Sequence, residues 1–249
     1  MLIDLHAHTS GISKCCKIDA PGMVRVAKDA GLDGVVLCNH YDECYVKNGD
    51  ALAFARRYVE EYEYARACGE EIGCSVLFGI ELSPLRYPGV HLLIYGLGPD
   101  FLLENPHLYE AEQQELYRTV QRAGGILVQA HPWRRQDRLL DVRYLDGVEI
   151  SCHPLYDGTH LRFLAAVAAE NELFLTCGGD FHNDTHRPKC GIYLPDGIEN
   201  TEMLAAYFIG AEDVRLAVQE VDERRTHNVI FRRRVGIISD VYEGENDGK

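Results

Sequence analysis

The first ten residues, MLIDLHAHTS, constrain this chain more than any other stretch. The run Leu2–Leu5 is apolar except for Asp4, which predicts a short buried strand that ends at His6 and His8. Side chains two positions apart in a strand point to the same face, so the two imidazoles are expected to project together. Two imidazoles directed at one point form half of a metal site. The rest of the sequence must supply the other half.

Apolar strands alternate with helical segments about seven times along the chain. The predicted strands are Leu2–Leu5, Gly34–Cys38, Ser75–Ile80, His91–Tyr95, Ile126–Gln129, Gly147–Ile150 and Leu173–Thr176, with Val229–Ile238 as a candidate last strand. The predicted helices cover Asp19 to about Ala30, Asp50–Cys68, Asn105 to Gly124, Thr159–Glu170, Asn200–Gly210 and Ala211–Glu220. Continuous apolar strands predict a parallel sheet that is covered on both faces. Because no glycine-rich phosphate loop follows a strand, a closed or nearly closed (β/α) barrel is favoured within the α/β class.

Length and composition exclude several classes of protein. The chain has 249 residues, which suits a single domain over 1–249, although the tail from about residue 224 has no clear assignment. The net charge of −14 argues against nucleic acid as a partner. No apolar stretch is long enough for a membrane span, and the N-terminus does not resemble a signal peptide. Nine cysteines without a CxxC pair argue against a disulfide framework, so we expect a cytoplasmic protein; nothing indicates its oligomeric state.

Histidines and carboxylates recur at the ends of the predicted strands. These residues are His6, His8, His40, Glu81, His131, Asp180 and His182, with His91 as an exception at the start of its strand. A single histidine at a strand end is more often hydrogen-bonded and structural than a metal ligand. The carboxyl ends of parallel barrel strands converge on one face, however, and His, Asp and Glu side chains gathered there form a typical ligand set. The sequence therefore predicts a shared metal centre.

The segments that carry these residues also resemble a known family. DLHAHTS, the turn at His40, GIELS, the strand at His91, QAHPW and GGDFH occur in the order found in the PHP (polymerase and histidinol phosphatase) family. The resemblance covers roughly Met1–Pro195, which is most of the chain. It implies a distorted (β/α)7, TIM-like barrel that holds two or three divalent metals and, in stand-alone members, phosphoesterase activity.

Carried over by position, the resemblance implies three metal positions. The ligands would be His6, His8, Glu81 and Asp180 for the first, a shared Glu81 with His91 and His131 for the second, and His40 with His182 for the third. The third position usually takes another histidine from the loop after HxH, where this chain has Lys14, Cys15 and Cys16. A thiolate from either cysteine, or the fixed charge of Lys14, could substitute. The chain also departs from the family at Asn39, where Asp is usual, and at Glu149, Cys152 and His153 after the sixth strand.

The implied chemistry is hydrolysis of a phosphate ester by a metal-bridging hydroxide. Two metals about 3.5–4 Å apart bind phosphoryl oxygens and lower the pKa of a bridging water, and a carboxylate such as Glu81 has one oxygen for each ion. Mixed His and carboxylate ligands suit Zn, Mn or Fe. Candidates for proton transfer to the leaving group are His182, His153 and His40. Candidates for substrate binding on the same rim are Arg134, Arg187, His186 and Lys14.

The leading interpretation is a metal-dependent phosphoesterase, either a monoesterase or a diesterase, that acts on a small phosphorylated metabolite. One alternative is a non-catalytic, regulatory metal-binding module, which the nearly complete ligand set disfavours. Another is a nuclease, which the acidic charge disfavours. Hydrolysis at carbon, as in barrel amidohydrolases, usually adds a carboxylated lysine at a strand end, and no predicted strand ends in lysine.

Overall fold

The computed structural model describes residues 1–46, 49–134, 138–154, 159–220 and 225–242. Its strands are β1 (Leu2–Ala7), β2 (Gly34–Leu37), β3 (His40–Tyr41), β4 (Ser75–Phe78), β5 (Ile80–Leu82), β6 (Leu92–Tyr95), β7 (Ile126–Gln129), β8 (Gly147–Ser151), β9 (Phe174–Gly178), β10 (Gly191–Tyr193), β11 (Asp213–Gln219), β12 (Thr226–Arg232) and β13 (Gly236–Tyr242). Its α-helices are α1 (Ala20–Asp29), α2 (Ala51–Ile72), α3 (Pro99–Glu104), α4 (Gln113–Arg122), α5 (Leu161–Glu170) and α6 (Thr201–Gly210), and two 3-10 turns cover Leu108–Glu110 and Val142–Tyr144.

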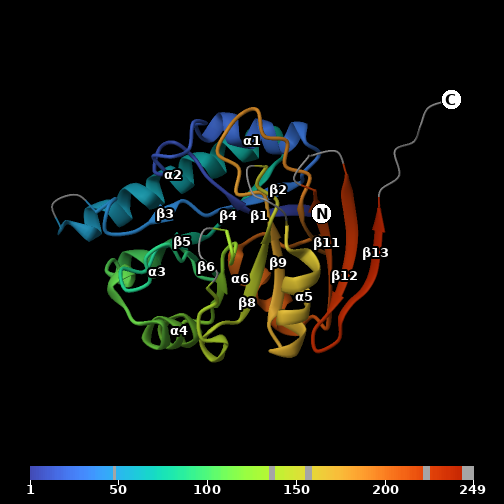
Figure 1. The fold of residues 1–249 in the computed structure, drawn as a ribbon. Helices are drawn as coiled ribbons and strands as arrows, with labels where there is room; N and C mark the ends of the chain where they lie inside the picture. Colours follow the sequence, from blue (N-terminus) through green and yellow to red (C-terminus); the bar gives the residue numbers. More distant parts are fainter. Residues whose placement is uncertain (47–48, 135–137, 155–158, 221–224, 243–249) are drawn as a thin grey trace.

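The strands form two sheets in a mixed α/β fold (Figure 1). One sheet has the order β13-β12-β11-β10-β1-β2-β4, and the other has the order β3-β5-β6-β7-β8-β9. The chain passes from the first sheet to the second twice, where β2 leads into β3 and β4 leads into β5. On the other side, β9 lies beside β1, joined by a bridge between Ala7 and Phe181 and by the bond from the Asp180 N–H to the His6 carbonyl, 2.8 Å. The predicted (β/α)7 barrel is therefore seen only in part, because the described strands form no single closed ladder.

The sequence-based prediction of a wholly parallel sheet is wrong at β6. This strand pairs antiparallel with both β5 and β7, whereas the pairs β1–β2, β2–β4, β7–β8 and β8–β9 are parallel. The segment between β5 and β6 contains no helix, and a short connection of this kind can join only antiparallel neighbours. The reversal has a consequence for the site. It places the start of β6, and with it His91, at the same rim as the ends of the parallel strands.

Local signals in the sequence set most of the helix ends. Asp19 and Asp50 cap α1 and α2 by accepting bonds from the backbone N–H groups of Gly22 and Ala53, both 2.9 Å long. Asn200 caps α6 in the same way, through a 2.9 Å bond from the Met203 N–H. The helix predicted to begin at Asn105 is wrong, however. The 3-10 turn Leu108–Glu110 occupies the first part of that segment, and the helix, α4, begins eight residues later at Gln113.

The last third of the chain differs most from the prediction. The segment Ala211–Glu220 is not a helix, because β11 covers most of it with a partly alternating pattern of exposed and buried residues. The candidate strand Val229–Ile238 is two antiparallel strands, β12 and β13, with a turn between them. They pair next to β11, which is joined to β1 by β10. The chain from Thr226 to Tyr242 therefore belongs to the same sheet as β1 (Figure 1). Residues 243–249 lie outside the described part.

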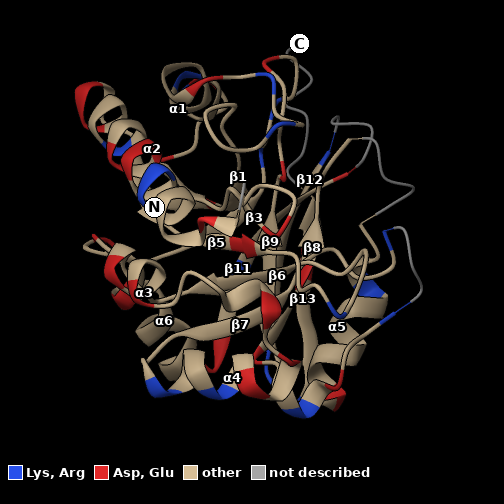
Figure 2. Ribbon diagram, turned by 90° about the vertical axis from the view of Figure 1, so that its left-hand side faces the viewer, with Lys and Arg blue, Asp and Glu red and all other residues tan. Residues whose placement is uncertain are grey.

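Charge is distributed unevenly over this framework. Figure 2 shows residues of both charges on the outer helices and loops, and acidic positions among the central strands. Glu81, Glu149 and Asp180 are fully buried. Buried carboxylates are costly unless they are paired with donors or cations. No helix in the described residues is long and apolar enough to cross a membrane.

Candidate metal centre

The end of β1 brings two imidazoles together as the strand period predicts. The Nε2 atoms of His6 and His8 lie 3.1 Å apart. The Oδ1 atom of Asp180 lies 3.0 Å from Nε2 of His8 and 3.7 Å from Nε2 of His6. All three side chains are fully buried, and their ligand atoms form one of the groups compact enough to hold a metal ion.

Glu81 is the centre of the site. Its Oε1 atom lies 2.7 Å from Nδ1 of His91 and 3.0 Å from Nε2 of His131. Its Oε2 atom lies 2.6 Å from Nδ1 of His40, and each oxygen is also 3.5 Å from one imidazole of the β1 pair. The two oxygens of one carboxylate therefore face two different sets of imidazoles. This is the arrangement that a bridging carboxylate requires.

The backbone at the end of β9 lies very close to β1 at two glycines. A Cβ atom on Gly178 would lie 2.4 Å from Cβ of His6, and a Cβ atom on Gly179 would lie 2.5 Å from Oδ2 of Asp4. Only glycine fits at these positions. The Oδ1 atom of Asp4 accepts bonds from the N–H groups of Gly179 and His6, 2.8 and 2.9 Å long. Asp4 thus fixes the position of the loop that carries Asp180.

The backbone at two of the site residues is left-handed. His131 has φ 29° and Asp180 has φ 47°. Such conformations cost roughly 1–3 kcal/mol each in a non-glycine residue and are common at functional sites. Here each one turns a side chain that follows a strand toward the shared rim.

A second layer of polar groups orients the imidazoles. Glu149, which the sequence marked only as a departure from the family, accepts a 2.9 Å bond from Nδ1 of His6 and a 3.1 Å bond from the N–H of His131. Ser13 lies 3.1 Å from Nδ1 of His8, and the carbonyl of Asp180 accepts a 2.7 Å bond from Nδ1 of His182. With Nδ1 engaged in this way, Nε2 is the ligand atom of each ring. Partners of this kind usually support metal-binding histidines.

Burial and charge shift the pKa values of these groups in opposite directions. Burial raises the pKa of Glu81, but the surrounding imidazoles, first His40 and His91, outweigh it and hold that pKa well below its usual range. Burial lowers the pKa of His6, but Glu149 and Asp180 raise it well above its usual range. Burial and the neighbouring His182 hold the pKa of His8 well below its usual range. Burial raises the pKa of Asp180 as well, but His6 and His8 outweigh it and hold that pKa well below its usual range. Glu81 and Asp180 are therefore ionised, and they create a negative field at the paired imidazoles.

The chemistry of these donors fits a divalent cation. Oε2 of Glu81 is buried without a partner in hydrogen-bonding geometry, although Nδ1 of His40 lies 2.6 Å away. The Nε2 atoms of His6 and His8 approach each other closely while Nδ1 of each ring is already engaged. Imidazole nitrogens that converge on a common point beside two ionised carboxylates are stabilised by a cation in the middle.

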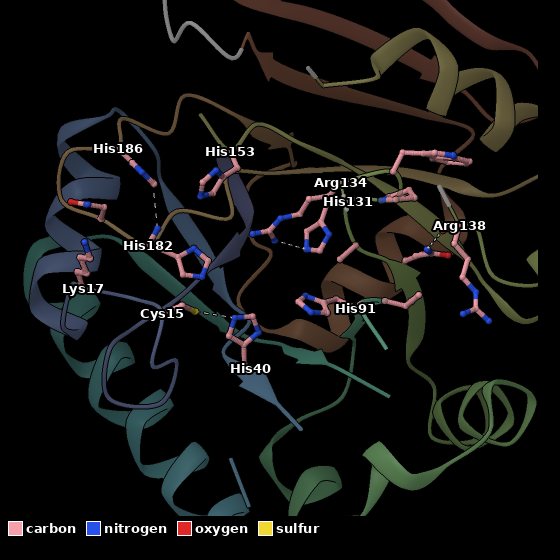
Figure 3. Close-up of a pocket in the computed structure, with 17 residues that line it drawn as sticks. Cys15, Lys17, His40, His91, His131, Arg134, Arg138, His153, His182 and His186 are labelled. Atoms are coloured by element: carbon pink, nitrogen blue, oxygen red, sulfur yellow. Dashed lines mark hydrogen bonds between the residues drawn. The ribbon is translucent and has the colours of Figure 1, made fainter. Parts of the chain in front are cut away.

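A cavity of about 540 Å³ opens above this cluster (Figure 3). It contains four of the residues predicted to act on substrate: Arg134, His153, His182 and His186. It is also lined by Lys17, Arg138 and Asn183, which the sequence reasoning missed because nothing in their local patterns distinguishes them from surface residues. Gln129, the first residue of the QAHPW motif, lines it as well and was likewise not predicted as a substrate contact. A volume of this size suits a small metabolite.

Arg134, the predicted phosphate clamp, lies beside the cluster and lines the cavity. One guanidinium nitrogen lies 3.2 Å from Oδ2 of Asp180 and 3.4 Å from Nε2 of His131. Its side chain is largely buried beside the cluster. A phosphate bound to the metals would therefore meet a fixed positive charge.

The structure does not bring two other predicted substrate contacts, Arg187 and Lys14, into this cavity. Arg187 is exposed and donates to the backbone carbonyls of Asp184 and His186, and it does not line this cavity. Lys14 donates to the carbonyl of Cys44, 3.1 Å away, with its ammonium group over the ring of Tyr45. Both side chains follow motif residues closely in the sequence, but the loops direct them away from the cluster.

The fold is shared with solved structures of low sequence identity. One, from Bifidobacterium adolescentis and titled as a candidate metal-dependent phosphoesterase, is 18% identical with a TM-score of 0.51 over 82% of this chain and 93% of that one. A two-domain protein from Bacteroides vulgatus, said to contain a predicted PHP-like metal-dependent phosphoesterase, is 16% identical with a TM-score of 0.57 over 93% of this chain and 65% of that one. A Chromobacterium violaceum amidohydrolase with bound sulfate is 16% identical with a TM-score of 0.58 over 83% of this chain and 96% of that one. No family model and no curated protein sequence matches the chain. The fold is therefore the one found in PHP-like proteins, as the sequence motifs predicted.

Proposed function

We propose that this protein is a metal-dependent hydrolase that cleaves a phosphate ester of a small metabolite. The observation that carries the proposal is the position of Glu81 between the imidazoles. Its Oε1 atom lies within 3.5 Å of nitrogens of His6, His91 and His131, and its Oε2 atom lies within 3.5 Å of nitrogens of His8 and His40. His6, His8 and Asp180 would hold one ion with Glu81. His91 and His131, which lie 2.7 and 3.0 Å from Oε1 of Glu81, would hold a second. Two such ions, of Zn, Mn or Fe, would bind the phosphoryl oxygens and supply an activated water at neutral pH.

The remaining side chains of the cavity suit an anionic substrate. Arg134 lies beside Asp180, and Lys17 and Arg138 line the same cavity. These cations contrast with the net charge of −14 for the whole chain, which disfavours nucleic acid as the substrate. A small phosphorylated molecule fits both the positive lining and the volume. The cytoplasmic location stays a prediction from the sequence.

The imidazoles above the cluster differ in their protonation. Burial lowers the pKa of His153 to about 4, so this ring is neutral at neutral pH and can accept a hydrogen bond. Burial also lowers the pKa of His182, but Cys15 and Asp180 outweigh it and raise that pKa above its usual value. Without an ion beside it, His182 is therefore the better donor to a leaving oxygen, and His153 the better acceptor.

The reaction class is tested with a substrate panel. Chelator-treated protein is resupplied with Mn²⁺, Zn²⁺ or Fe²⁺ and offered phosphate monoesters, phosphate diesters, a single-stranded DNA oligonucleotide and simple amides. We expect release of phosphate from a monoester or cleavage of a small diester. Hydrolysis of an amide alone would favour the second candidate, an amidohydrolase, which the name of the Chromobacterium neighbour suggests. No turnover of any ester with any of the three metals would contradict the proposal.

A further inference from the structure

The loop after HxH brings a thiol to the open edge of the cluster. Sγ of Cys15 lies 3.2 Å from Nε2 of His40 and lines the cavity (Figure 3). The loop is tied in place by the bond from the Lys17 N–H to the carbonyl of His182, 2.8 Å, and by the bond from the Ser13 N–H to the carbonyl of Thr9, 2.9 Å. The position of the thiol is thus set by the same backbone that positions His182.

Lys14, Cys15 and Cys16, the three residues that could replace the family's histidine, point in different directions. Sγ of Cys16 is turned into the core, where it donates to the carbonyl of Ile18, 3.5 Å away, and only 5% of the residue is exposed. The ammonium group of Lys14 is held by the carbonyl of Cys44 on the far side of the loop. Cys15 remains as the one residue of the three whose side chain faces the imidazoles.

The imidazoles around this thiol present ligand atoms that other contacts leave available. Nδ1 of His182 is bonded to the carbonyl of Asp180, so its Nε2 is the free ligand atom. Nδ1 of His40 faces Glu81, which leaves its Nε2 directed at Cys15. Ligand atoms of His40 and His182 also lie, with one of His8, within 4.8 Å of one another, close enough to share an ion. This group has His8 in the place of Cys15, and it shows that two of the three proposed ligands lie within reach of one ion.

We propose that Cys15, His40 and His182 hold a third divalent ion, and that the sulfur ligand makes this position selective for Zn²⁺ or Fe²⁺ over Mn²⁺. Thiolate is a soft ligand, and Mn²⁺ prefers carboxylate, carbonyl and water oxygens. Cys15 releases its proton to solvent when the ion binds. The inference rests on the proposed function only in treating the cluster as metal-binding. As a ligand His182 cannot donate a proton, which leaves His153 and His186 to exchange protons above the cluster.

Cobalt substitution tests this assignment without any activity measurement. Chelator-treated protein is titrated with Co²⁺, and the absorbance and the number of bound ions per chain are recorded. We expect three ions and a thiolate-to-cobalt charge-transfer band in the near ultraviolet. Cys15→Ser should lose the band and one ion, whereas Cys15→His should regain the third ion without the band. The matched controls Cys16→Ser and Cys44→Ser, one buried and one exposed, should keep both.

The outcomes distinguish this inference from the proposed function. A band that persists in Cys15→Ser would place cobalt on other thiols and overturn the inference, as would two bound ions and no band in the parent. Either result leaves the two-ion centre around Glu81 intact. Binding of no metal at all would contradict both proposals. Circular dichroism of each variant shows whether a lost ion reflects a lost ligand or a lost fold.

Discussion

Glu149 and His6 are 143 positions apart in the sequence, yet the carboxylate of one accepts a 2.9 Å hydrogen bond from Nδ1 of the other, and both side chains are fully buried. The bond joins β8 to β1 across the floor of the cluster. It fixes the ring of His6 so that Nε2 faces His8 and Asp180. A carboxylate behind an imidazole also increases the basicity of the ligand nitrogen.

Replacement of this carboxylate tests its supporting role. Glu149→Gln keeps the shape of the side chain but removes its charge, and we expect metal affinity to fall about 10- to 100-fold. The affinity is measured by competition with a chromogenic chelator. Glu115→Gln, on the exposed side of α4, serves as the control and should bind metal like the parent. Equal affinity in Glu149→Gln and the parent would show that the bond has no effect on the ion.

The two arginines that follow the histidine motifs should differ in their effect on substrate. Arg134→Ala removes a charge that lies 3.2 Å from Asp180, so we expect KM for a phosphate ester to rise about 10- to 100-fold, the loss of one or two charge-assisted hydrogen bonds. Arg187→Ala should leave KM unchanged because its guanidinium is bonded to backbone carbonyls outside the cavity. Steady-state kinetics of both variants measure these KM values. A larger effect at Arg187 than at Arg134 would reverse the assignment.

Glycine at position 178 should be indispensable. In Gly178→Ala the new methyl group would lie 2.4 Å from Cβ of His6 and 2.6 Å from Oε1 of Glu149, so β9 or β1 must shift. We expect a loss of about 1–3 kcal/mol in the free energy of unfolding, together with weaker metal binding. Gly210→Ala is the control, since nothing lies within 4 Å of a methyl group there. Urea denaturation measures both, and equal stability of the two variants would contradict the close approach.

Asp4 predicts a pH dependence of stability in the metal-free protein. Burial raises its pKa to about 8 from an unfolded value of 3.8. The folded protein therefore keeps a proton that the unfolded chain has released, and stability falls as the pH rises from about 4 to 8, by roughly 1.4 kcal/mol per pH unit. Asp4→Asn resembles the neutral carboxyl group, and Oδ1 can still accept both backbone bonds.

Urea denaturation of chelator-treated protein between pH 5 and 8.5 checks this effect. The free energy of unfolding should fall less steeply with pH in Asp4→Asn than in the parent, so that the variant gains relative stability toward pH 8.5. Parallel curves for the two proteins would show that Asp4 is ionised in the folded state over this range.

The sequence could predict the cluster because two features of it can be read from short segments. These are the two-residue period of side chains in a strand and the convergence of the carboxyl ends of parallel strands at one rim. His6 and His8 lie together as the spacing required. Glu81 within β5 and the polar residues that follow β7 and β9 meet them at one rim. The position of His91 was anomalous in the sequence, at the start of a strand. The antiparallel direction of β6 explains it, because the start of that strand lies at the rim where its neighbours end.

Other features depend on contacts that no local pattern contains. The supporting role of Glu149 requires β8 to lie beside β9 near β1, and the separation of Cys15 from Cys16 depends on how one loop is tied to another. The segment at β11 is rich in residues that also form helices, and only pairing with β10 and β12 makes it a strand. Whether the predicted barrel closes likewise depends on long-range hydrogen bonds between strands, which no local pattern contains. The described strands form two sheets.

The central claim is that a pair of ions bridged by Glu81 hydrolyses a phosphate ester. The most direct measurement follows phosphate release from the best monoester or diester of the panel while metal is added back to chelator-treated protein in known equivalents. We predict little release with the first equivalent, a steep rise as the second is bound, and no release at any equivalent for Glu81→Gln with its circular dichroism unchanged. Full activity in the chelated protein, or in Glu81→Gln, would contradict the account.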